Sequence, residues 1–227
     1  MITDPNKIFD TKSAAVQTLI SERNWQKLVD RNKITRILNF LKNDITFGFT
    51  KKACLPASEI LTAGHGQALT KSILLKTLFD ACGVLCRFHA FRVKKELYTG
   101  LTRPMTYNLL PNTLITAWIE VFYEEQWLVA DGILLDSDYM RGLQIGILPS
   151  EGEFIGMGAG IFLSGNSHMI WNGKNHTYCQ RAAITEDMGI IDNFEWFFSE
   201  YKSEIKQLGK ISHKFANKII DNVRNPQ

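Results

Sequence analysis

Residues 64–87 read GHGQALTKSILLKTLFDACGVLCR and carry the clearest structural signal in the chain. After the glycine turn, apolar residues recur at helical spacing, which predicts an amphipathic helix over 67–82. The stretch then runs into CRFHAFRV (86–93), where alternating apolar residues predict a strand. The apolar stripe of the helix would hold Leu69, Ile73, Leu74, Leu78 and Cys82, and its wet side Lys71, Lys76 and Asp80.

Two further β-rich runs follow, LITAWIEVFY (114–123) and QWLVADGILL (126–135). Only two glutamates separate them, and two residues is the length of a tight hairpin turn. This hairpin would bring Thr116 and Asp131 side by side on neighbouring strands. We therefore expect the helix over 67–82 to pack on an antiparallel sheet.

The segments on either side of this core are mostly helical in pattern. Residues 12–45 have the apolar spacing of two helices, and residues 50–65 that of a turn or short helix. Glycine-rich residues 142–165 predict loops with close backbone packing, and residues 192–224 predict a further helical region. Helices, then strands, then helices is the order typical of an α+β fold with an antiparallel sheet.

A single domain is expected over residues 1–227. Its parts would be an N-terminal helical segment (1–50), a core (55–136) and a C-terminal extension (137–227). The length suits one domain of generous size, and neither an internal repeat nor a low-complexity linker divides the sequence. An apolar content of 45% with 22% charged residues permits a sizeable core.

Composition argues against several classes of partner. A net charge of +3 is too small to indicate nucleic acid or an anionic membrane, and the lysines at 202–218 are predicted to form a solvated helix face. No apolar run approaches the ~18 residues of a membrane span. The polar start, MITDPNKIFDTKS, has no signal-peptide pattern, so cytoplasmic residence is expected. Free, mostly buried thiols and no metal site are predicted, since neither CxxC nor a metal-ligand spacing relates Cys54, Cys82, Cys86 and Cys179.

Beyond these patterns, the chain from about residue 55 onward resembles a bacterial subfamily of transglutaminase-like cysteine acyl-transfer proteins. Members of that subfamily read GQC-x-TK, CRFHGF, HSW-x-EVYY, EGxILD, W-x-G-x-NTYIQ, an I-x-x-DFG-x-FD stretch and a closing MN-x-x-V-x-x-IR. The matching segments follow in the same order: GQALTK (66–71), CRFHAF (86–91), TAWIEVFY (116–123), DGILLD (131–136), WNGKNHTYCQ (171–180), ITEDMGIID (184–192) and ANKIIDNVR (216–224).

The resemblance implies a catalytic site whose nucleophile and general base have been replaced. The family places a cysteine nucleophile at the start of the helix, a histidine base on the next strand pair and an acid after it. This chain has Ala68, Thr116 and Asp131 at those positions. An alanine offers no nucleophile, and a threonine hydroxyl cannot act as a general base near pH 7. The family's cysteine-type acyl transfer is therefore not expected.

Three hypotheses of function are consistent with these residues. The first is a pseudoenzyme that binds a peptide, amide or small acyl ligand beside the free N–H groups of the helix start. The second is a repurposed enzyme acting on a small metabolite, with Asp131 as acid/base and Thr116 or His65 as polar helpers. The third is an engineered inactive cysteine enzyme. We expect no cofactor, and a small-molecule or peptide ligand contacted by Gln67, Ala68, Tyr107, Trp118 and Trp171.

Overall fold

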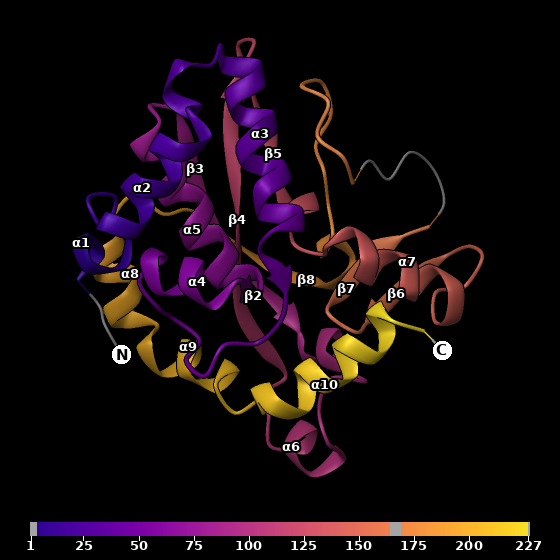
Figure 1. Ribbon diagram of the computed structural model, residues 1–227. Helices are drawn as coiled ribbons and strands as arrows, with labels where there is room; N and C mark the ends of the chain where they lie inside the picture. Colours follow the sequence, from indigo (N-terminus) through magenta and orange to yellow (C-terminus); the bar gives the residue numbers. More distant parts are fainter. Residues whose placement is uncertain (1–3, 164–168, 227) are drawn as a thin grey trace.

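One antiparallel sheet carries the core of the computed structural model, which describes residues 4–163 and 169–226 (Figure 1). Its strands lie in the order β5-β4-β3-β8, and their bounds are β3 (Cys86–Lys94), β4 (Thr113–Tyr123), β5 (Gln126–Val129) and β8 (Ile184–Ile190). The predicted α+β class is confirmed. The edge strand β8 belongs to a segment for which we predicted no strand.

The hairpin between β4 and β5 forms where the sequence predicts it. Tyr123 pairs with Gln126, and the two turn residues Glu124 and Glu125 have φ of 48° and 62°. Positive φ at both central positions is the geometry of a type I′ turn, whose twist matches that of the flanking strands. The turn therefore forms without the glycine that usually relieves this conformation.

The second strand of the hairpin is shorter than the predicted run 126–135, and the prediction of a strand over 130–135 is wrong. The strand ends at Val129, and the chain then turns into a short 3₁₀ helix, η3 (Asp131–Ile133). Glu120 pairs with Val129, so a continued register would place Ile133 opposite Thr116. Thr116 and Asp131 therefore do not lie side by side on neighbouring strands, because the backbone N–H of Asp131 leaves the sheet to donate to the Thr177 carbonyl.

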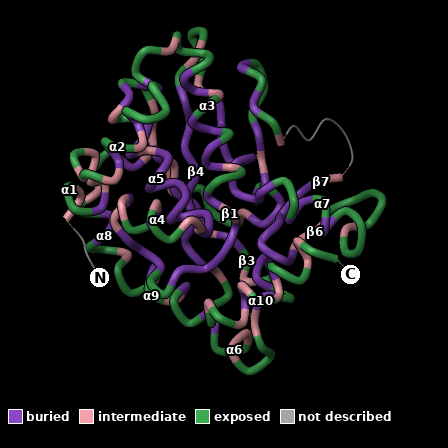
Figure 2. The backbone as a smooth tube through the Cα atoms, in the orientation of Figure 1, coloured by how far each residue is buried: buried purple, intermediate pink, exposed green. Residues whose placement is uncertain are grey.

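Helix α5 (Ala68–Ala81) packs on the sheet as expected, at nearly the predicted bounds. It also packs against α3 (Asp30–Asn43) and α4 (Ala57–Ala63), so helices cover the side that would otherwise face water (Figure 1). Lys71 is consequently 0% exposed, so the prediction that it lies on the solvent-facing side of the helix is wrong. Figure 2 shows the central helix among the buried parts of the chain.

The outer helical segments also follow the sequence patterns. The N-terminal pair is α2 and α3, and the short helix α4 ends at Gly64, whose φ of 68° suits a glycine cap. The remaining elements are α1 (Pro5–Ile8), α2 (Ala14–Arg23), η1 (Trp25–Lys27), β1 (Thr46–Phe47), β2 (His65–Gly66), η2 (Lys95–Tyr98), α6 (Pro104–Asn108), η4 (Arg181–Ala183), α8 (Phe194–Glu200), α9 (Lys202–Leu208) and α10 (His213–Arg224).

The glycine-rich stretch is more regular than predicted. It contains the end of α7 (Ser137–Gly146) and a hairpin of β6 (Glu153–Gly156) and β7 (Ala159–Phe162), where we expected loops. The expected close packing is present at Gly158, whose φ is 78° and whose Cα faces the Phe47 ring so closely that a Cβ would overlap it. Residues 164 and 165 of this stretch lie outside the described residues.

Two further features bear on the class of protein. Within the described parts of the chain, no helix has the length and apolar character needed to cross a bilayer. The four cysteines are all free, as predicted: Cys54, Cys82 and Cys179 are buried, and Cys86 is partly exposed. Burial raises the pKa of Cys54, Cys86 and Cys179 to about 12, so these thiols stay protonated at neutral pH.

Candidate functional site

The start of α5 holds Ala68 against a very small cavity. The cavity measures about 10 Å³ and is lined by Ala68, Ala117, Trp118 and Asp131 among others. A volume of this size accommodates about one water molecule. The side chain of Gln67 turns away, its Oε1 accepting from the Thr50 N–H at 3.4 Å. A helix N-terminus therefore lies at Ala68, as the sequence predicts, but a peptide has no space beside it.

Asp131 is held by backbone donors from the 171–180 segment. Its Oδ2 accepts the N–H of Cys179 at 2.6 Å and that of Gln180 at 2.8 Å. Burial raises the pKa of Asp131 to about 6, and the two N–H bonds only partly oppose that effect. Asp131 is 4% exposed, so its carboxyl group contacts other protein groups and lines the small cavity.

Thr116 is tied to the same segment by a side chain that sequence reasoning missed. Its hydroxyl donates to Oε1 of Gln180 at 3.1 Å, and Nε2 of Gln180 donates to the Gly158 carbonyl at 3.2 Å. Gln180 thus connects Thr116 and Asp131 through its side chain and its backbone. The signal available in the sequence was its place at the end of WNGKNHTYCQ, one of the segments that carry the resemblance.

The other predicted site residues are spread over several places. His65 is half-exposed on β2 with Nδ1 2.8 Å from the Ala63 carbonyl, and Tyr107 lies on α6 with the Lys95 ammonium 5.0 Å from its ring centre. Neither lines the cavity beside Ala68. Trp118 does, and its ring also packs on Phe91 at 3.9 Å between centroids. The structure therefore groups Ala68, Trp118 and Asp131, with Thr116 joined to Asp131 through Gln180.

Lys71 and its surroundings form a buried polar cluster that the sequence did not reveal. Its Nζ donates to the carbonyls of Ile133 and Leu134 at 2.6 and 3.0 Å, at the end of η3. Burial lowers the pKa of Lys71 to about 7, and nearby Asp136 opposes this. Asp136 in turn pairs with Arg224 of α10 at 2.8 Å. These contacts fix the turn that carries Asp131.

A second charged cluster lies on the sheet face opposite α5. Glu120 accepts from Arg87 at 2.6 Å and lies 2.6 Å from Nδ1 of His89, whose Nε2 is 2.6 Å from Asp187 on β8. Burial alone would raise the pKa of Glu120, but its bonds to His89 and Arg87 bring it down to about 2. All four residues come from segments quoted for the resemblance, and the cluster ties three strands together.

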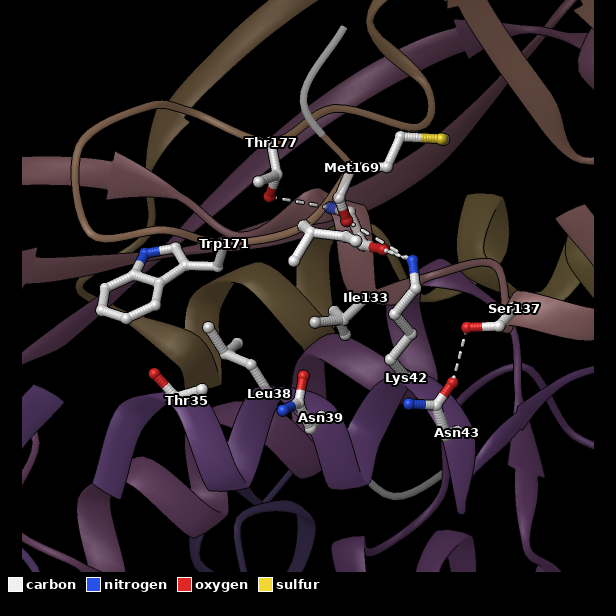
Figure 3. Close-up of a pocket in the computed structure, with 12 residues that line it drawn as sticks. Thr35, Leu38, Asn39, Lys42, Asn43, Ile133, Ser137, Met169, Trp171 and Thr177 are labelled. Carbon is white, nitrogen blue, oxygen red and sulfur yellow. Dashed lines mark hydrogen bonds between the residues drawn. The ribbon is translucent and has the colours of Figure 1, made fainter. Parts of the chain in front are cut away.

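An open pocket lies on the other side of η3 (Figure 3). It measures about 110 Å³ and is bounded by α3 on one side and by η3 and residues 169–177 on the other. Figure 3 shows Lys42 reaching along its wall to the carbonyls of Gly132 and Met169, at 2.8 and 3.4 Å, with Trp171 opposite. Trp171, predicted to contact a ligand beside Ala68, therefore lines this pocket instead.

Lys42 gives the pocket its chemical character. An ammonium group has three donors, and two of those of Lys42 are used by carbonyls. No carboxylate pairs with it within residues 4–163 and 169–226. Amides of Asn39 and Asn43 lie at the rim, and Leu38, Ile133 and Trp171 add apolar wall. Such a mixture suits a small group with an oxygen acceptor and a short apolar part.

Comparison with protein families, with curated proteins and with solved structures gives no match to this chain. Among the described residues, His, Cys, Asp and Glu side chains form no cluster that could hold a metal ion.

Proposed function

We propose that this chain is a transglutaminase-like pseudoenzyme that binds the end of a peptide, amide or small acyl ligand without transforming it. The ligand would occupy the pocket between α3 and η3, with Lys42 contacting its carboxylate or carbonyl oxygen. The observation that carries the proposal is the contrast between two neighbouring spaces, about 10 Å³ beside Ala68 and about 110 Å³ beside Lys42, with Ile133 lining both.

The size of the larger pocket limits the ligand. Sites for whole drug-sized molecules usually exceed about 300 Å³. A space of about 110 Å³ suits one terminal group, such as a carboxylate, a primary amide or a short acyl chain. The apolar wall of Leu38, Ile133 and Trp171 would contact the alkyl part.

Binding without catalysis is favoured over a repurposed acid/base role for Asp131. Its raised pKa suits proton transfer, but an acid or base must come within hydrogen-bond reach of its substrate. The neighbouring cavity admits about one water molecule, and one carboxylate oxygen is already occupied by two N–H donors.

The binding test is an NMR titration of the indole N–H signal of Trp171 with butyrate and with N-acetylglutamine. Both should shift the signal in the native chain, and Lys42→Met should weaken binding by roughly tenfold, the loss of one charge-assisted hydrogen bond. Lys27→Met, at an exposed lysine of η1, is the matched control. Equal affinity in the Lys42→Met variant would contradict the proposed site.

The catalytic test is the double substitution Ala68→Cys with Thr116→His. Because the space beside residue 68 is so small, the folded variant should neither hydrolyse p-nitrophenyl acetate nor transfer its acyl group to an amine. Cysteine-dependent turnover would instead support an inactivated cysteine enzyme.

A further inference from the structure

A second binding feature lies away from the sites described above. The connection between β1 and α4 passes beside α9 (Figure 1). A groove of about 420 Å³ opens between them, which we call the basic groove. It is lined by Lys51, Lys52, Ala53, Cys54, Lys206, Gly209 and Lys210.

The rim of the basic groove is wholly cationic. All four lysines are exposed, and none forms an ion pair with a carboxylate in the part of the chain that the structure describes. The chain as a whole carries only +3. The four groove charges exceed that total, so the rest of the chain carries a net charge of about −1, and the groove brings together four cations with no acidic residue in its lining.

The floor of the groove is apolar. Ala53 is 5% exposed and Cys54 is 2% exposed. The Cys54 thiol is protonated at neutral pH because burial raises its pKa, so it adds apolar surface to the floor and no charge. The carbon stems of the surrounding lysines extend that surface while their ammonium groups remain in water.

We infer that the basic groove binds an acidic peptide segment of a partner protein, one with an apolar side chain between carboxylates. The apolar side chain would lie on Ala53 and Cys54, and the carboxylates would meet the lysines of the rim. The groove volume is within the roughly 300–1,000 Å³ of ligand sites and holds a few side chains. Such a peptide complements both the charge of the rim and the floor beneath it.

Nucleic acid fits the groove less well. Single strands are held by aromatic rings that stack on bases, and phosphates by arginine forks. The lining has neither an aromatic residue nor an arginine. An anionic bilayer is disfavoured too, because the apolar surface is the floor of a hollow and does not project toward a membrane.

Fluorescence anisotropy with the full chain and a labelled Glu-Glu-Leu-Glu-Glu peptide tests the inference. Binding should weaken several-fold when salt rises from 50 to 300 mM. The paired reversal Lys206→Glu with Lys210→Glu should weaken it by roughly tenfold or more, and Lys51→Glu with Lys52→Glu should act similarly. The matched control is Lys94→Glu with Lys174→Glu, at exposed lysines outside the groove.

A second peptide, Glu-Glu-Gly-Glu-Glu, tests the floor. Loss of the leucine contact should weaken binding by roughly tenfold. Equal affinity for the two peptides, or equal losses in the groove and control variants, would overturn the inference. Tighter binding of a ten-residue oligothymidylate or of phosphatidylserine vesicles, lost in the same groove variants, would overturn it in favour of those partners.

Discussion

Replacing Asp131 by asparagine should stabilise the protein at neutral pH and change little in acid. Burial raises the pKa of this carboxyl from 3.8 to about 6 in the folded chain. A raised carboxyl pKa contributes stability that is fully present below the unfolded value and is lost as pH rises through the folded value. A difference of about two pKa units corresponds to about 3 kcal/mol.

Asparagine is neutral at every pH and should keep the native contacts. Its Oδ1 can accept the N–H groups of Cys179 and Gln180, as the carboxylate oxygen does. The free energy of unfolding of Asp131→Asn should therefore exceed that of the native chain by only about 0.5 kcal/mol near pH 4 and by up to about 3 kcal/mol above pH 7.

Urea denaturation at pH 4, 5, 6, 7 and 8 measures this difference. Glu59→Gln, at an exposed carboxylate, controls for general effects of pH. If Asp131→Asn is less stable than the native chain at pH 8, the ionised carboxylate must be stabilised by its N–H donors and by Lys42. In that case the reasoning from burial is wrong.

Three further outcomes are expected. Arg224→Met should lower the free energy of unfolding by about 3–5 kcal/mol, because it leaves Asp136 buried without its partner. Urea denaturation measures this loss, which should shrink at acidic pH, where Asp136 is protonated. Gly158→Ala should lower the thermal midpoint and reduce the free energy of unfolding by about 2–5 kcal/mol, because of its left-handed φ and the overlap with the Phe47 ring. Gly146→Ala is the control: its new methyl group faces open space, so the midpoint should not fall. The pKa of His89 is raised overall: burial lowers it, but the bonds to Glu120 and Asp187 raise it more. The protonated imidazole therefore stabilises the fold below about pH 6.5, and this stabilisation is lost as pH rises through the folded pKa. His89→Gln should flatten that part of the curve of thermal midpoint against pH, and an unchanged curve would contradict the ion-pair interpretation.

Local patterns predicted the parts of the fold that depend on local chemistry. The spacing of apolar residues in α3 and α5 and the paired glutamates of the hairpin are signals that neighbours in sequence supply. The edge strand β8 was missed because its residues have weak apolar alternation, and its pairing with β3 contains register shifts. Such pairing is fixed by contacts far along the chain.

The candidate site was harder to predict for the same reason. Lys71 has the helical position of a solvated residue, and only the packing of α3, α4 and η3 around α5 buries it. Gln180 reaches Thr116 across 64 residues of sequence. The size of the cavity beside Ala68 depends on how side chains from several elements fill the space, which no sequence motif reports.

The two outer strands of the sheet also bear on how this protein avoids aggregation. Strand β5 offers only four residues to another chain, and β8 has Glu186 and Asp187 exposed along its length. Short strands and charged side chains at sheet edges oppose the addition of a strand from a second molecule. Neutralising both acids would leave β8 (Ile184–Ile190) without a charged side chain. An uncharged edge strand of this kind can pair with the same strand of a second molecule, which would allow edge-to-edge polymerisation.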